Sequence, residues 1–229
     1  MDIGAIQGTS LIDYPGKVCA VFFTLGCNFR CGFCYSPELV FSRLKKLPGK
    51  NIEDFLKERQ KFLDAIILSG GEPLLQKDIV GFCKKLKKYG YLVGIETNGS
   101  KPGTLKKLID NKLVNFIAMD IKSDLEHYSK ITGVDVNTSD IKKSIELIKN
   151  SGVDLEFRTT VVPGFYDKEI AENIGKILKG ANKYVLQQFN NSKEMIDSSF
   201  KNKKPYKEAE IKKFRKILEK YIDNVGLRF

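Results

Sequence analysis

Stretches of consecutive apolar and β-branched residues alternate along the chain with segments whose apolar residues recur at helical spacing. Six of these stretches have the length and composition of strands, and they cover residues 18–25, 65–69, 91–96, 114–120, 155–162 and 184–189. Between them the apolar residues stand three or four apart, as Ile79, Cys83 and Leu86 do, which predicts amphipathic helices. Such alternation indicates parallel strands joined by right-handed crossovers. Because six units are too few to close an eight-stranded barrel, we predict an α/β fold, an open partial (β/α)6 barrel.

The domain organisation is simple. A chain of 229 residues suits one large domain, and no repeat or linker divides it. We expect a single domain over residues 1–229, with its core at about 15–190 and a C-terminal helix and closing segment at 205–229. Apolar residues mark this last helix, and 224–229 form a candidate closing strand. Residues 190–204 are polar and lysine-rich, and we predict a loop there, near the mouth of the site.

The net charge is +11, from 39 Lys and Arg against 28 Asp and Glu. Such a balance is compatible with nucleic-acid binding. A nucleic-acid surface would present aromatic residues interleaved with basic ones on an exposed strand face, whereas the aromatics here fall mainly on core positions, so we do not expect a nucleic-acid partner. We interpret the charge as a mostly solvated surface that would also favour an acidic partner. No apolar run approaches the ~20 residues that cross a bilayer, and the N-terminus lacks a signal-peptide pattern. Five cysteines, an odd number, favour a reducing cytoplasm.

Cys27, Cys31 and Cys34 form a Cys-x3-Cys-x2-Cys motif directly after the first predicted strand, where the chemistry of parallel barrels collects. A zinc site usually adds a fourth Cys or His, and the only histidine, His127, is remote. Cubane iron–sulfur clusters are normally held by four cysteines, so three indicate a cluster with one iron open to a small ligand. A structural zinc knuckle, a disulfide framework and accidental core cysteines are the alternatives. We favour the cluster, and we interpret Cys19 and Cys83 as core residues.

Further polar groups follow the later strands. Ser-Gly-Gly-Glu-Pro at 69–73 follows the second strand, and its paired glycines would let a ligand approach the backbone. Glu96 ends the third strand, and Asp120 and Lys122 share one face at the end of the fourth. Charged side chains are rarely buried without a partner, so these groups either bind a ligand or pair with each other. We favour ligand binding for Asp120, Lys122 and Arg158, and structural ion pairing for Glu156; His127 has no predicted catalytic role.

The cysteine motif resembles the signature of the radical S-adenosylmethionine (SAM) superfamily. Within it the chain looks like a glycyl-radical-enzyme activating enzyme, most similar to the activating proteins of anaerobic ribonucleoside-triphosphate reductase. Asp13-Tyr14-Pro15-Gly16 resembles the Asp-x-Pro-Gly of that group, and residues 69–73, 96–99, 120–122 and 158–164 follow in the expected order. The resemblance runs from the N-terminus to Phe189, and the last forty or so residues are less diagnostic.

The resemblance implies a role for each matching residue. Cys27, Cys31 and Cys34 would ligate a [4Fe–4S] cluster. The SAM contacts would come from Phe33, near the adenine, from the turn that meets the methionine amino group, and from polar residues of later strands: Phe33, Gly70, Gly71, Glu72, Glu96, Asp120, Lys122, Arg158 and Asn190. Asn190 falls roughly where related enzymes carry a histidine, so its role departs from the family's pattern. The chain lacks the cysteine-rich insertion that holds further clusters in some activating enzymes.

The implied reaction is radical generation on a protein. The reduced cluster would cleave SAM to methionine and a 5′-deoxyadenosyl radical, which would abstract hydrogen from one glycine of a partner. The implied partners are a glycyl radical enzyme, first of all the anaerobic ribonucleotide reductase, and a flavodoxin- or ferredoxin-type electron donor. The alternatives are a radical SAM enzyme for a small molecule, such as a deazapurine synthase, and a non-enzymatic basic module that binds RNA or metal.

Overall fold

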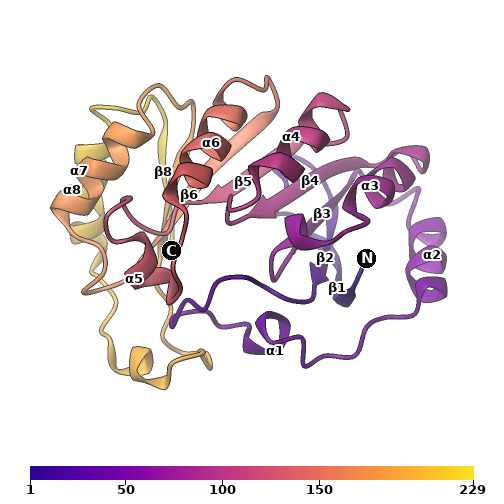
Figure 1. The fold of residues 1–229 in the computed structure, drawn as a ribbon, viewed down its shortest axis with the longest axis horizontal. Helices are drawn as coiled ribbons and strands as arrows, with labels where there is room; N and C mark the ends of the chain where they lie inside the picture. The colour runs from indigo at the N-terminus through magenta and orange to yellow at the C-terminus, as the bar shows by residue number, and fades with distance from the viewer. The chain divides into compact units, whose positions relative to one another are not determined.

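The computed structural model describes residues 1–229, and its central feature is a sheet whose strands follow chain order from β1 to β8. The strands are β1 (Ile3–Ser10), β2 (Cys19–Thr24), β3 (Ala65–Gly70), β4 (Leu92–Thr97), β5 (Phe116–Asp120), β6 (Asp154–Val161), β7 (Tyr184–Gln188) and β8 (Val225–Arg228). The order starts at β1 and ends at β8, so the sheet is not closed (Figure 1). The predicted α/β class and open partial barrel are confirmed.

Helices connect the strands. They are α1 (Pro37–Val40), α2 (Gly49–Glu58), η1 (Pro73–Leu75), α3 (Ile79–Lys88), α4 (Pro102–Asp110), α5 (Tyr128–Thr132), α6 (Thr138–Lys149), α7 (Lys168–Ile177), η2 (Ser198–Asn202) and α8 (Glu208–Leu218). Each longer helix buries one apolar stripe, as α3 does with Ile79, Cys83 and Leu86. None of the helices is long and apolar enough to span a membrane.

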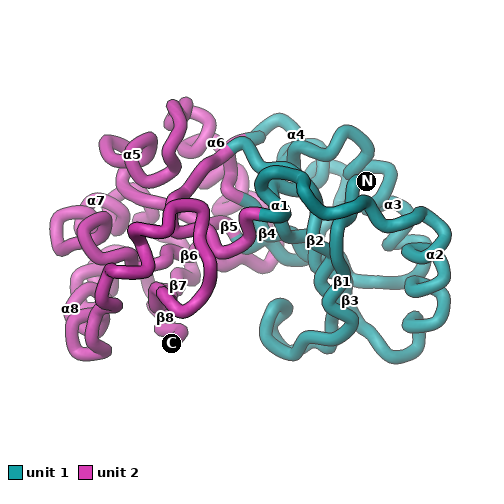
Figure 2. Tube along the Cα trace, turned by 90° about the horizontal axis from the view of Figure 1, so that it is seen from below, with its two compact units in different colours: residues 1–28, 38–97, 101–118 teal, residues 29–37, 98–100, 119–229 magenta.

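The chain folds into two compact units. The first comprises residues 1–28, 38–97 and 101–118 (Figure 2, teal). In this unit β1 runs antiparallel to β2, whereas the pairs β2–β3 and β3–β4 are parallel. Side chains of neighbouring strands share one core cluster, in which Val21, Ile67 and Ala118 are almost fully buried. The carboxyl ends of β2 and β3 lie in register, with Thr24 opposite Gly70. This register brings the segments that follow the two strands together.

The second unit comprises residues 29–37, 98–100 and 119–229 (Figure 2, magenta). Its strands β6, β7 and β8 are parallel. The buried carboxylate of Glu156 on β6 pairs with Lys183 at 2.9 Å and with Arg228 of β8 at 3.1 Å. This ion pair ties the last strand to the sheet, so the predicted structural role of Glu156 is confirmed.

The six predicted strands are all present, with bounds that shift by one or two residues. The closing strand at 224–229 is confirmed as β8, and a final helix is confirmed as α8. The antiparallel strand β1 was not predicted. The segment 190–204 is a loop except for the short helix η2. Cys19 and Cys83 are fully buried core residues, as predicted. The single-domain organisation stays a prediction.

Candidate active site

The cysteine motif begins directly after β2. Gly26 has a positive φ of 86° and donates its N–H to the carbonyl of Leu39 at 2.8 Å. The N–H of Cys27 donates to the carbonyl of Val40 at 3.3 Å. The chain therefore leaves β2 through a turn at Gly26, and hydrogen bonds to carbonyls of α1 hold this turn in place. None of the three motif cysteines forms a disulfide; Cys31 is buried, and the other two are half-buried.

The Gly-Gly-Glu turn after β3 lies against the backbone that precedes Cys27. The N–H of Glu72 donates to the Gly26 carbonyl at 2.8 Å, and that of Gly71 donates to the Thr24 carbonyl at 2.9 Å. A Cβ atom on Gly71 would lie 2.0 Å from the Gly26 carbonyl oxygen, a distance that no side chain tolerates. Gly70 has a φ of 107°, which L residues rarely adopt. Both glycines are thus required for this close approach.

Glu72 holds a buried carboxylate within the first unit, with only 1% of the residue exposed. Its Oε1 accepts hydrogen bonds from the Thr97 hydroxyl at 2.7 Å and from the Leu74 N–H at 3.0 Å. These two donors favour the ionised carboxylate, which is the form that attracts an ammonium group. The role of Thr97 was not predicted, although the residue lies inside the Glu-Thr-Asn-Gly motif at the end of β4.

Glu96 precedes Thr97 on β4, so its side chain points to the opposite face of the strand. It is half-buried, and its Oε2 accepts a hydrogen bond from the Ser69 hydroxyl at 2.6 Å. Within the first unit, Gly71 and Glu72 therefore lie beside Gly26, the residue before Cys27. Glu96 is tied instead to Ser69, one residue before Gly70.

The second unit carries the rest of the cysteine motif. The N–H of Cys34 donates to the carbonyl of Cys31 at 2.9 Å, which forms a tight turn. The N–H of Arg30 donates to the Thr132 carbonyl at 2.8 Å, at the C-terminus of α5. These bonds fix the backbone on which two of the three predicted ligands stand.

A chain of charges connects Arg158, Asp120 and Lys122 in the same unit. The Asp120 carboxylate accepts from Arg158 Nε at 3.0 Å through one oxygen and from Lys122 Nζ at 3.0 Å through the other. The side chains of Arg158 and Lys122 are largely buried, with 10% and 18% of their area exposed. All three residues were predicted to bind a ligand, and in the structure Arg158 and Lys122 each contact Asp120. Their pairing is also the structural alternative named above, so their contact with a ligand stays a prediction.

Burial and charge act in opposite directions on this chain of charges. Burial alone would raise the pKa of Asp120, but the two cations lower it to about 2. Burial alone would lower the pKa of Lys122, but Asp120 and then Cys31 raise it above its ordinary value. Lys122 also lies over the ring of Phe33, with 5.8 Å between its Nζ and the ring centroid. A permanent cation therefore stands near Cys31 and Phe33 of the motif.

The remaining predicted residues behave differently. Asn190 is exposed, and its carboxamide oxygen accepts hydrogen bonds from the Ser192 N–H and hydroxyl at 2.8 and 2.7 Å. Its part in SAM binding stays a prediction. His127 is half-exposed at the start of α5, with its ring bonded to Asp124 at 2.8 Å.

These residues fit a cluster and a SAM molecule. The donor set is three cysteines that form no disulfide, and thiolates are the ligands that iron–sulfur clusters prefer. The cation Lys122 lies near Cys31. The glycine turn offers bare backbone beside the carboxylate of Glu72, which suits the amino group of an amino acid.

The comparison with known proteins identifies the family. The family profile described as the radical SAM superfamily matches residues 21–177. The chain belongs to the radical SAM superfamily. Members of this superfamily use a [4Fe–4S] cluster and S-adenosylmethionine, so the protein is an enzyme of this class. The alternative of a non-enzymatic RNA- or metal-binding module is thereby set aside.

Two relatives refine the assignment within the radical SAM superfamily. A protein of Methanocaldococcus jannaschii, assigned by name as a glycyl-radical enzyme activating enzyme, is 37% identical over 99% of this chain and 95% of its own length. The pyruvate formate-lyase-activating enzyme of Clostridium pasteurianum is 29% identical over 96% of both chains. The chain thus falls among the glycyl-radical enzyme activating enzymes.

Solved structures agree on the fold. The crystal structure of Streptococcus suis SuiB has a TM-score of 0.69 and 16% sequence identity, and the match covers 91% of this chain. A structure of SuiB bound to S-adenosylmethionine has a TM-score of 0.65. This chain spans about half the length of SuiB, which is 48% covered. The likeness shows the radical SAM fold alone.

Proposed function

We propose that this enzyme generates the glycyl radical of an anaerobic ribonucleoside-triphosphate reductase. The observation that carries the activating function is the match to a relative assigned to that function, which spans nearly the whole of both chains. A small-molecule enzyme built on a larger or differently extended chain would not match over its full length. The reductase as partner is supported by the Asp-Tyr-Pro-Gly segment at 13–16, the motif that resembles this branch.

In this proposal Cys27, Cys31 and Cys34 hold the [4Fe–4S] cluster. When bound, the reduced cluster supplies the electron that cleaves SAM into methionine and the 5′-deoxyadenosyl radical that takes hydrogen from the partner's glycine. A flavodoxin- or ferredoxin-type protein reduces the cluster. The five cysteines form no disulfide, which suits the reducing cytoplasm where we place the reaction.

The SAM-binding roles in this proposal are those that the family resemblance implies. Glu72 accepts the ammonium of the methionine moiety, and Gly70 and Gly71 let it approach the backbone. In the second unit the backbone of Phe33 meets the adenine. The triad Asp120, Lys122 and Arg158 offers fixed charges to the carboxylate and the ribose of SAM, while Glu96 and Asn190 are expected to make further contacts.

The test is electron paramagnetic resonance of anaerobically reconstituted, reduced protein with SAM and the host's anaerobic ribonucleotide reductase. We expect an organic doublet on the reductase. The doublet should be absent with Cys31→Ala and present with Cys83→Ala, the matched change of a buried core cysteine. A doublet on pyruvate formate-lyase but not on the reductase would overturn the partner and keep the activating function. A cluster signal altered by SAM, with no doublet on either protein, would indicate a small-molecule substrate.

A further inference from the structure

The loop between β7 and α8 lies against the cysteine motif. The N–H of Ile196 donates to the carbonyl of Cys34 at 3.0 Å, and the N–H of Asp197 donates to the carbonyl of Gly32 at 3.0 Å. The two bonds reach the carbonyls on either side of Phe33. Both partners belong to the second unit. The orientation of the peptides around Phe33 is therefore fixed by a segment more than 160 residues further along the chain.

Phe200 of η2 packs on the same part of the motif. It is only 6% exposed, in a segment that is otherwise polar and lysine-rich. A Cβ on Gly32 would lie 2.6 Å from the Cε2 atom of Phe200 and 3.2 Å from the Cβ of Asp197. The Phe200 ring also lies 6.3 Å from the ring of Phe33, centroid to centroid. The absence of a side chain at Gly32 thus leaves room for the Phe200 ring.

Neighbouring groups hold Phe200 in place from the other side. Its ring stacks on Phe165 with a centroid distance of 5.5 Å and an angle of 21° between the planes. The Lys203 ammonium lies over both rings, 5.1 Å from the Phe165 centroid and 5.3 Å from that of Phe200. Cation–π and stacking contacts of this kind stabilise the ring in this position. Phe200 is therefore held against the cysteine motif by several contacts.

We propose that residues 196–200 form a clasp that positions Cys31 and Cys34 for the cluster, with Phe200 as its positioning residue. The inference rests on the proposed function, because it assumes that these cysteines hold the cluster. The clasp acts through the backbone: two hydrogen bonds orient the Gly32 and Cys34 peptides, and Phe200 blocks any collapse of the loop onto the space beside Gly32. Groups that orient ligands typically change metal affinity by about 10- to 100-fold.

The experiment compares Phe200→Ala with Phe214→Ala in the reconstituted full chain. Phe214 on α8 is also 6% exposed and lies against Tyr166 and Tyr206, so its truncation makes a similar core defect away from the motif. The first measurement is the rate at which a chelator removes cluster iron, at a temperature where circular dichroism shows both variants folded. We expect about tenfold faster iron loss for Phe200→Ala and a wild-type rate for Phe214→Ala. Equal rates in the two variants would overturn the clasp.

A second pair of variants separates positioning from folding. Gly32→Ala should release iron as fast as Phe200→Ala, because the new Cβ meets the ring. The double variant Gly32→Ala, Phe200→Ala should be no worse than Phe200→Ala alone, since the clash is gone. Additive losses in the double variant would overturn the match between the two positions.

The spectrum of the reduced cluster gives a readout that a mere loss of stability would not move. With SAM added, the paramagnetic resonance signal of Phe200→Ala should differ from that of the wild type. The signal of Phe214→Ala should be the same as that of the wild type, and the signal of Phe200→Leu should be close to it. An unchanged signal in Phe200→Ala would contradict positioning. A wild-type protein that binds no cluster would instead overturn the proposed function, and the clasp with it.

Discussion

At the residue scale, Asp120 is the centre of the charge chain, and its behaviour with pH can be derived from its partners. Lys122 and Arg158 hold its pKa at about 2, against an ordinary value of 3.8. A depressed pKa stabilises the fold at pH values above 3.8, and the contribution is lost as the pH falls from 3.8 towards 2. The other groups that face it, the two cations and the Tyr128 hydroxyl, do not titrate in that window.

We therefore expect Asp120→Asn to lower the free energy of unfolding at pH 6 by about 3 kcal/mol, because two largely buried cations lose their counterion. The variant should also lose less stability than the wild type between pH 4 and pH 2. Urea unfolding of the cluster-free protein across this range measures both effects. Asp110→Asn is the control, since its pair with Lys106 is exposed and should change stability by less than about 1 kcal/mol. Identical acid slopes for Asp120→Asn and the wild type would contradict the argument.

Thr97 is a second residue with a measurable role. Its hydroxyl donates one of the two hydrogen bonds that the buried carboxylate of Glu72 accepts through Oε1. Thr97→Val keeps the shape and removes the donor, so SAM affinity of the reconstituted protein should fall about tenfold, the equivalent of roughly 1.4 kcal/mol. Thr104→Val, on α4, should bind SAM as the wild type does. Isothermal titration under anaerobic conditions would decide, and unchanged affinity in Thr97→Val would count against the role of Glu72.

At the element scale, the approach of the β3 turn to the end of β2 depends on Gly71. A methyl group there would lie 2.0 Å from a backbone carbonyl oxygen, which cannot move like a side chain. We expect Gly71→Ala to lower the free energy of unfolding by about 3 kcal/mol, at the upper end for an overpacked site.

The matched change is Gly103→Ala on α4, where a Cβ would meet nothing within 4 Å. Alanine in place of glycine stabilises the middle of a helix by about 0.5–1 kcal/mol. Gly103 is the second residue of α4, so this variant should be at least as stable as the wild type. Thermal unfolding of both variants tests the pair. A Gly71→Ala protein as stable as the wild type would mean that the turn does not need the close approach.

The same elements show what local pattern can and cannot predict. Most of the strands from β2 to β7 are short apolar, β-branched stretches, and β6 keeps this character around its charged residues Glu156 and Arg158, so the local pattern located them. β1 escaped because Gly4, Ala5 and Gly8 weaken its pattern, and it exists through antiparallel pairing with β2. The residues of the site likewise divide into those that local pattern can predict and those that it cannot. The cysteines and the glycine turn are local motifs, whereas the contact between Gly32 and Phe200 joins positions that no spacing rule connects.

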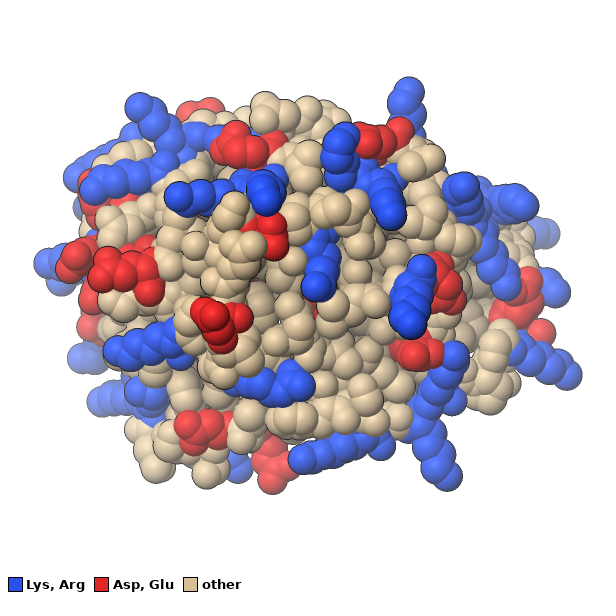
Figure 3. Space-filling model, viewed as in Figure 1, with Lys and Arg blue, Asp and Glu red and all other residues tan.

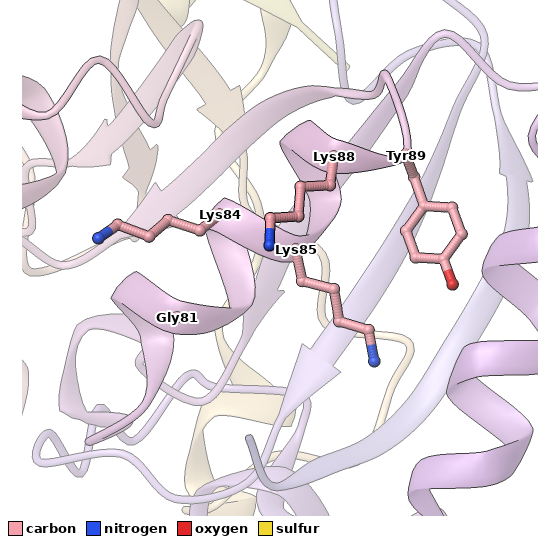
Figure 4. A pocket seen from close by; sticks show the side chains of 5 residues that line it. All are labelled: Gly81, Lys84, Lys85, Lys88 and Tyr89. Atoms are coloured by element: carbon pink, nitrogen blue, oxygen red, sulfur yellow. The ribbon is translucent and has the colours of Figure 1, made fainter.

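At the scale of the whole molecule, the net charge of +11 is spread rather than gathered. Lys and Arg are scattered over the face seen in Figure 3, with Asp and Glu between them. One basic hollow lies along α3 and the residue that follows it, lined by Gly81, Lys84, Lys85, Lys88 and Tyr89 (Figure 4). In this hollow, Lys85 and the Tyr89 hydroxyl both contact Glu53, and the Glu53 carboxylate neutralises part of the positive charge of the hollow. None of the predicted site residues lines it.

A scattered charge attracts an acidic electron donor through its total rather than through one patch. Lys84→Glu with Lys88→Glu, on α3, and Lys213→Glu with Lys216→Glu, on α8, each lower the net charge by four, from +11 to +7. We expect both double variants to slow the association with reduced flavodoxin to the same extent. The difference from the wild type should vanish near 1 M salt, where the screening length is about 3 Å.

Stopped-flow reduction of the cluster at several salt concentrations measures this association. A loss confined to the α3 variant would show that the basic hollow is a docking patch, because steering by the total charge cannot distinguish two equal changes on different helices. Equal losses would mean that the donor finds the enzyme by its overall field. The specificity of the encounter must then come from uncharged contacts, since scattered lysines would attract any acidic protein of similar size equally well.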